Sequence, residues 1–174
     1  MTGRRIGRHI GGGREPEDER VRRERQEALR EVWSRWTSGV TLLATRAEGR
    51  VHALTVGSFF PVSLDPPLVL ASLGPNAAAL PYLDPGSVFG ISILAGDQRA
   101  LASRYADPFP VGPDPFPEEG PPITAGALAT MTCVVEELLE RGDHTLVIGR
   151  VDEVSTGEEG AALAYFRRSY HAIG

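Results

Sequence analysis

The most constraining feature of this chain is a series of seven short runs rich in β-branched and aromatic residues, separated by Gly, Pro, Asp and Asn. Such runs predict strands, because branched and aromatic side chains pack well on a pleated surface. They cover residues 40–45, 51–59, 68–73, 88–95, 129–140, 144–155 and 162–170. Seven short strands in one domain predict a mainly β fold, either a barrel or a sandwich.

Three segments between the strands have other patterns. Residues 75–84 and 96–106 have helical spacing and would plug or flank a barrel. Residues 107–126 contain seven prolines, which neither a strand centre nor a helix interior accepts. This segment is therefore predicted to be a long surface loop, of the kind that often serves as a lid or a dimer arm.

The N-terminal region has two parts with different compositions. Residues 1–16 are rich in Arg and Gly and are predicted to form a disordered arm. Good helix formers dominate residues 17–36 and predict a leading helix, which Ser38 and Gly39 would end. Residues 17–174 are accordingly expected to form a single domain.

Composition restricts the kinds of function. A chain of 174 residues is long enough for about one compact core, and its net charge of -5 argues against nucleic-acid binding. The single cysteine, Cys133, excludes an intrachain disulfide or a thiolate metal cluster built by one chain. No apolar run approaches the roughly 20 residues of a membrane helix, and residues 1–20 lack the apolar segment that is typical of a signal peptide. These features predict a soluble, cytoplasmic protein without a metal site, a nucleic-acid partner or a membrane partner.

The common phosphate-loop, dinucleotide, nucleophile-elbow and zinc-protease motifs are missing, and four polar stretches stand out instead. Thr55 and Ser58 flank a glycine that permits a bulge toward a ligand, although both are also ordinary strand residues. At Gly96 and Asp97 a strand passes into a helix, where free backbone amides could bind an anion or a polar ring edge. Asp97 as a plain helix cap explains that sequence equally well.

The other two stretches carry a histidine and a basic, aromatic cluster. His144 opens a strand directly after a turn, where its side chain could overlook a barrel mouth, but a lone histidine is often structural. The stretch YFRRSYH, residues 165–171, is either a solvated edge strand or a group that closes over a planar or phosphorylated ligand. Together the four stretches predict a binding site of hydroxyls, backbone amides and one histidine.

The order of these stretches resembles that of the flavin reductase-like family, the small reductase components of two-component flavin monooxygenases. The resemblance covers about residues 30–171 and rests on SFFPVSLDPPLV, SILAGDQRALASRYA, GDHTLVIGRV and ALAYFRRSYH. It implies an FMN-binding split barrel, a Greek-key antiparallel barrel with flanking helices, which assembles as a homodimer. It also implies an oxidoreductase that transfers hydride from NADH or NADPH to FMN or FAD and releases reduced flavin to a monooxygenase.

The resemblance implies a role for individual residues. His144 would be the catalytic residue, standing where nicotinamide and flavin meet. Flavin would be bound by a set of residues distributed along the chain: Thr55, Ser58, Phe59, Ser72, Leu73, Asn76, Ile93, Leu94, Ala95, Gln98, Arg168 and Tyr170. Catalysis of this kind depends mainly on stacked geometry, which agrees with the missing acid–base pair.

One departure from the family pattern concerns the residues expected to bind the phosphate of the flavin. Ala77 and Ala79 stand where the family commonly has hydroxyl residues, which leaves Asn76 and backbone amides, with Arg168 as a further candidate. The alternative function is therefore a split barrel with a changed pocket. It would be either a biosynthetic enzyme acting on a small aromatic or polyketide substrate, or a flavin-free binding protein.

Overall fold

The computed structural model describes residues 19–174, so the predicted arm at residues 1–16 lies outside the described residues. The chain divides into two compact units, with the boundary between Arg35 and Trp36. The first unit contains one helix, α1 (Glu19–Trp33), which is rich in charged residues and buries none of its side chains. All the described strands belong to the second unit.

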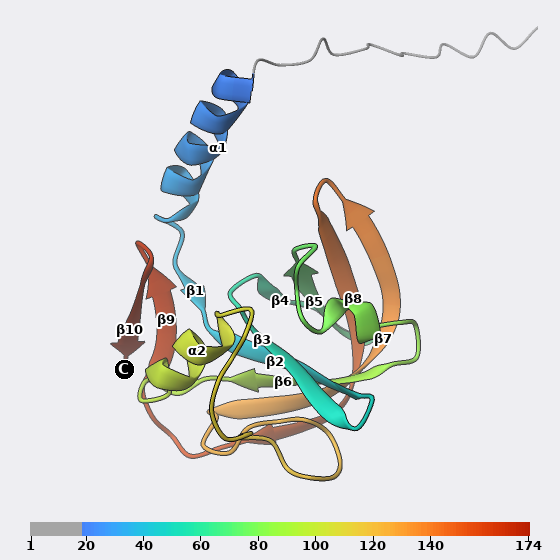
Figure 1. Ribbon diagram of the computed structural model, residues 1–174. Coiled ribbons are helices and arrows are strands. Elements are labelled where there is room, and N and C mark those ends of the chain that lie inside the picture. The colour runs from blue at the N-terminus through green and yellow to red at the C-terminus, as the bar shows by residue number, and fades with distance from the viewer. Residues whose placement is uncertain (1–18) are drawn as a thin grey trace, which may run out of the picture. The chain divides into compact units, whose positions relative to one another are not determined.

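The second unit contains ten strands and two short helical elements (Figure 1). In chain order these are β1 (Ser38–Gly39), β2 (Thr41–Ala47), β3 (Arg50–Val56), β4 (Phe59–Leu64), β5 (Pro67–Leu73), the 3-10 turn η1 (Leu80–Tyr82), β6 (Val88–Ile93), α2 (Arg99–Tyr105), β7 (Ala129–Arg141), β8 (His144–Thr156), β9 (Ala162–Phe166) and β10 (Ser169–Ile173). Strands therefore dominate, as the sequence pattern predicts.

The strands form two antiparallel sheets. The larger sheet has the order β3-β2-β6-β7-β8-β5-β4, and the smaller one has the order β1-β9-β10. Strand β5 pairs with β8 instead of with β6, which follows it in the chain, so the hairpins β4–β5 and β7–β8 lie side by side. This is a Greek-key order. The mainly β, antiparallel fold predicted from the sequence is confirmed.

One predicted strand, residues 51–59, is in fact two. Strand β3 ends at Val56 and β4 begins at Phe59, so the chain leaves one edge of the large sheet and enters the other within two residues. Gly57 lies at the break, where a Cβ would come within 2.9 Å of the Ser38 hydroxyl oxygen. The close approach explains the glycine, and an alternating apolar pattern alone does not reveal the change of partner.

The predicted strand at residues 162–170 is also two, because it turns back on itself as the hairpin β9–β10. The two turn residues, Arg167 and Arg168, have φ angles of 47° and 61°, a left-handed conformation for which Gly and Asn are the usual residues. Two arginines at these positions give no sequence signal for a turn. Their side chains stand at the exposed tip of the hairpin.

The helical segments are shorter than predicted. Within residues 75–84 only η1 is helical and the rest forms turns, whereas α2 occupies the later part of the segment at 96–106. The leading helix, predicted at residues 17–36, ends at Trp33, and the predicted stop at Ser38 and Gly39 is a short strand. In the described part of the chain, no helix is both long and apolar enough to cross a membrane.

Strand β2 is buried on both faces and separates two apolar clusters. On one face Leu43 packs in a cluster with Phe89, Cys133 and Val147, between the strands of the large sheet. On the other face Leu42 and neighbouring residues pack against α2 and β9. The second cluster positions α2 beside β3, and this arrangement shapes the cavities described below.

The proline-rich segment, residues 107–126, has no regular structure, as predicted, but it is anchored to the domain. Phe116 is 8% exposed, and the centroid of its ring lies 5.7 Å from that of Tyr105. The Arg104 guanidinium donates hydrogen bonds to the carbonyl oxygens of Pro113, at 2.6 Å, and Gly112, at 3.1 Å. These contacts hold the segment next to α2.

Burial raises the pKa of the Cys133 thiol to about 12, with a further contribution from Asp152. The thiol therefore stays protonated at neutral pH, and we expect the native protein to resist a thiolate-specific reagent such as Ellman's reagent at pH 8. Unfolding in urea should release one reactive thiol per chain. The stability gained from the neutral thiol should be lost as pH rises from about 9 toward 12. Rapid stoichiometric labelling of the native protein would contradict this expectation.

Candidate functional site

The predicted hydroxyl residues Thr55 and Ser58 are already engaged within the fold. The Thr55 hydroxyl donates to the carbonyl of Ala102 on α2 at 2.8 Å. The Ser58 hydroxyl donates to the carbonyl of Ser72 at 2.7 Å, and the Ser72 N–H donates to the carbonyl of Ser58 at 3.0 Å. Each hydroxyl oxygen can still accept a hydrogen bond from a ligand. The two side chains thus fix α2 and the end of β5 to the β3–β4 connection.

His144 lies at the start of β8, beside the end of β5. Its Nε2 is 3.7 Å from the point that a Cβ on Gly74 would occupy, and its side chain is 46% exposed. Nδ1 donates to the Asp143 carboxylate at 2.8 Å, and this hydrogen bond holds the pKa of Asp143 below its ordinary value. The carboxylate is therefore ionised at neutral pH and orients the ring, which leaves Nε2 available to a ligand.

The backbone at the end of β6 is more fully engaged than the sequence suggests. The Leu94 N–H donates to the Val40 carbonyl, and the Leu94 carbonyl accepts a hydrogen bond from the Leu163 N–H. The Ala95 N–H donates to the Gln98 side-chain oxygen at 3.0 Å. Gln98 also donates to the Ala125 carbonyl. A ring edge could reach the Ala95 N–H only if the Gln98 amide gave way.

Tyr170 lies on β10 against Tyr165, with the ring centroids 5.1 Å apart. Burial, followed by the proximity of Tyr165, raises the pKa of the Tyr170 phenol, so the hydroxyl remains a hydrogen-bond donor. Arg168, by contrast, stands at the exposed hairpin tip. The two residues are close in sequence but differ in exposure.

The predicted residues therefore gather in two groups. Leu94 and Tyr170 belong to the cluster around α2, to which Thr55 is tied through Ala102. A second group surrounds the ends of β4, β5 and β8: Ser58, Phe59, Ser72, Leu73 and His144. Asn76 is exposed, three residues beyond the end of β5.

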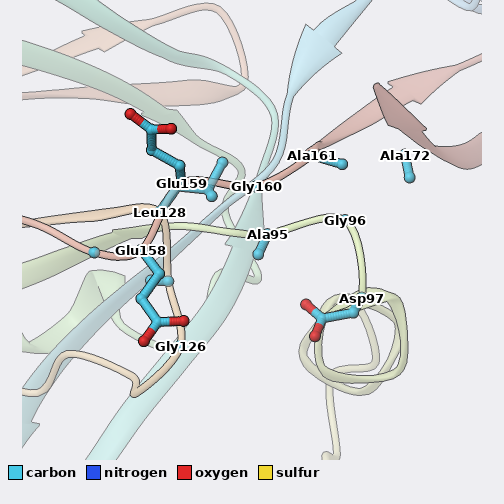
Figure 2. A pocket seen from close by; sticks show the side chains of 12 residues that line it. Ala95, Gly96, Asp97, Gly126, Leu128, Glu158, Glu159, Gly160, Ala161 and Ala172 are labelled. Carbon is cyan, nitrogen blue, oxygen red and sulfur yellow. The ribbon is translucent and has the colours of Figure 1, made fainter. Parts of the chain in front are cut away.

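A cavity of about 780 Å³ opens beside Ala95 (Figure 2). Glycines and alanines form much of its wall, and Asp97, Glu158 and Glu159 supply three carboxylates. None of the residues lining it is basic. Three negative charges would repel a phosphate group, so this cavity suits the neutral or cationic part of a ligand.

A second cavity, of about 450 Å³, lies between β3, α2, Ala78 and the first part of the proline-rich segment. Arg50, His52, Arg104 and Asp114 are among its lining residues. We call it the Arg50 cavity. Sequence reasoning missed it, because Arg50 and Arg104 read as ordinary charged residues after a turn and in a short helix.

The comparisons with known proteins agree with this architecture. The flavin reductase like domain matches residues 33–174. The 4-hydroxyphenylacetate 3-monooxygenase reductase component of Thermus thermophilus is 36% identical, over 85% of this chain and 97% of that protein. An NADH-dependent flavin reductase of Rhodococcus is also 36% identical, over 83% of this chain and 85% of that protein. The actinorhodin polyketide dimerase of Streptomyces coelicolor is 34% identical, over 85% and 86%.

Solved structures give the same result. A flavin reductase in its native state matches with a TM-score of 0.77 and 32% identity, over 91% of this chain and 99% of that chain. The NADH:FAD oxidoreductase of Streptomyces globisporus, solved with NAD and FAD fragments, matches with a TM-score of 0.77 and 29% identity. That match covers 87% of this chain and 94% of the other.

Proposed function

Because the chain belongs to the flavin reductase-like family, we propose that it is an NAD(P)H-dependent flavin reductase that supplies reduced FMN or FAD to a partner monooxygenase. The observation that carries the proposal is the family match, which extends over residues 33–174 and thus over the whole β domain. The names of the Thermus and Rhodococcus relatives support the monooxygenase partner and NADH as the donor.

The proposal assigns the polar groups of the candidate site to the ring of a flavin and to the nicotinamide. Bound flavin supplies the ring that accepts the hydride. In the proposal, the Thr55 and Ser58 oxygens accept hydrogen bonds at the β3–β4 connection, and the Tyr170 hydroxyl donates one from β10. His144, held by Asp143, positions the nicotinamide at the end of β5. These residues orient the reactants and need not transfer a proton.

We also propose that the protein is a homodimer and is cytoplasmic. The separation of the predicted residues into two groups supports the homodimer, since a second copy could bring the groups of two chains together at one site. Light scattering coupled to gel filtration would measure the mass. A monomer at the concentration used for turnover would contradict the dimer.

A second candidate function follows from the relative named actinorhodin polyketide dimerase. This relative has a biosynthetic name, yet it is about as similar to the present chain as the Rhodococcus flavin reductase is. Ala77 and Ala79 fit this alternative, because neither can give a hydroxyl to a flavin phosphate. In that case the same pocket would hold a small aromatic or polyketide substrate.

One experiment separates the two functions. The purified protein is titrated with FMN, FAD and riboflavin by fluorescence, and oxidation of NADH and NADPH is then followed with each flavin. The reductase proposal expects saturable binding and flavin-dependent oxidation of the nicotinamide. Adding a reduced-flavin-dependent monooxygenase should then yield hydroxylated product without contact between the two enzymes. Absence of binding and turnover with every flavin would favour the alternative.

A further inference from the structure

The segment after β5 cannot hold a phosphate group with side-chain hydroxyls. Ala79 is fully buried, and Ala77 packs against the apolar cluster around Phe89. The Ala77 N–H is also taken, since it donates to the Gly74 carbonyl at 3.0 Å. The donors that remain in this segment, the Asn76 side chain and other backbone N–H groups, are uncharged, so a positive group from elsewhere in the fold would strengthen the binding of a phosphorylated substrate.

The Arg50 cavity places such a group beside the same segment. Ala78 lines it, so the cavity borders the turn that carries Ala77 and Ala79. Arg50 lines the cavity from the start of β3, which lies far along the chain from Ala78. A cation and the hydroxyl-free turn are thus brought together by tertiary structure.

Arg50 and Arg104 differ in how far their guanidinium groups are engaged. Arg104 donates to Pro113, Gly112 and the Tyr105 hydroxyl, so it holds the proline-rich segment. The Arg50 side chain is exposed and forms no hydrogen bond or ion pair with any residue in the described range 19–174. Its donors are therefore available to a ligand.

The charges around the cavity favour an anion. Besides the two arginines it contains one carboxylate, that of Asp114, whose Oδ1 accepts the Phe116 N–H. Burial and the nearby Arg50 lower the pKa of His52, so that imidazole is neutral and adds no charge. The cavity beside Ala95 has three carboxylates and no basic residue. A phosphate is attracted to the Arg50 cavity and repelled by the cavity beside Ala95.

We propose that Arg50 binds the phosphate group of the flavin substrate, in the cavity between β3, α2 and Ala78, in place of the missing hydroxyls. The proposal rests on the proposed reductase function and deepens it. The enzyme then takes phosphorylated flavin, FMN or FAD, in preference to riboflavin. Arg50 is a binding residue and takes no part in hydride transfer.

The test compares riboflavin with FMN, which differ only by the phosphate. Kd is measured by flavin fluorescence for the wild-type chain and for Arg50→Gln. A charge-assisted contact to phosphate predicts that the variant binds FMN about tenfold or more weakly, whereas riboflavin binding changes less than about twofold. The wild-type preference for FMN should also shrink as salt is raised.

Two further variants are controls. Arg150→Gln makes the same change in net charge at an exposed residue of β8 that lines neither cavity and pairs with Asp152. It should bind FMN like the wild type. Arg168→Gln tests the competing arginine at the hairpin tip. If that variant, and not Arg50→Gln, loses FMN selectively, the proposal is overturned.

The remaining outcomes are equally decisive. An equal loss of FMN and riboflavin binding in Arg50→Gln would mean a structural role, and no loss would mean no contact. A raised KM for NADH with riboflavin as acceptor would assign Arg50 to the dinucleotide phosphates instead. Each of these overturns the proposal while leaving flavin reduction intact. Failure of the wild type to bind or reduce any flavin would instead overturn the proposed function, and this proposal with it.

Discussion

Replacement of Phe89 by alanine is expected to lower the free energy of unfolding by about 3 to 5 kcal/mol. Phe89 is 1% exposed and lies in the apolar cluster between the strands of the large sheet. Its strand partner on β7 is Cys133. Truncation removes the buried ring and leaves a cavity that the paired strands around it cannot close. Urea unfolding followed by circular dichroism measures the change.

A neighbouring glycine gives this prediction an internal check. A Cβ on Gly149 of β8 would come within 2.4 Å of the Phe89 ring, so Gly149→Ala should also destabilise the protein. Combined with Phe89→Leu, which removes the two clashing ring atoms, Gly149→Ala should cost less than it does alone. If Phe89→Ala lost less than about 1 kcal/mol, or if the two sites were additive, this account of the core would be wrong.

The second large effect is expected at His144. Replacement by alanine should lower kcat for NADH oxidation by about 10- to 100-fold, the size of loss expected when reactants are no longer held in position. Stability should hardly change, because the side chain is 46% exposed and hydrogen-bonds to Asp143, whose own side chain is largely exposed. Stopped-flow measurement of flavin reduction isolates the chemical step from product release.

Two variants separate positioning from other roles of His144. Asp143→Asn weakens the bond that orients the ring and should give a smaller loss of kcat. That bond lowers the pKa of Asp143, so the carboxylate stays ionised at pH values at which an ordinary one begins to be protonated. The difference in kcat between Asp143→Asn and the wild type should therefore persist to low pH and fade only below the ordinary carboxyl range. His171→Ala, at another exposed histidine, should leave kcat unchanged. A His144→Ala enzyme with wild-type kcat and KM would remove His144 from the proposed site.

Local sequence pattern predicted the strands well, and its errors share a cause. Apolar and β-branched runs report where strands lie, since alternation is a property of a few adjacent residues. They do not report a change of partner, so residues 51–59 and 162–170 were each predicted as one strand. At the break between them, Gly57 lies where a side chain would meet Ser38, which is distant in sequence. The turn at Arg167 and Arg168 lacks the usual turn residues.

The candidate site shows the same division. The polar stretches at Thr55, Ser58 and His144, and the family they indicate, could be read directly from the sequence. The internal hydrogen bonds that engage the two hydroxyls could not, because their acceptors Ala102 and Ser72 come from other elements.

By itself, the sequence determined that this chain forms a mainly β domain and belongs to the flavin reductase-like family, since both follow from short local patterns in a fixed order. Only the tertiary structure decided which charged residues lie beside the same cavity. Arg50, Ala78 and Arg104 line one cavity because β3, the turn after β5 and α2 pack together. Strand pairing and packing bring residues far apart in sequence into contact, and no local pattern records those contacts.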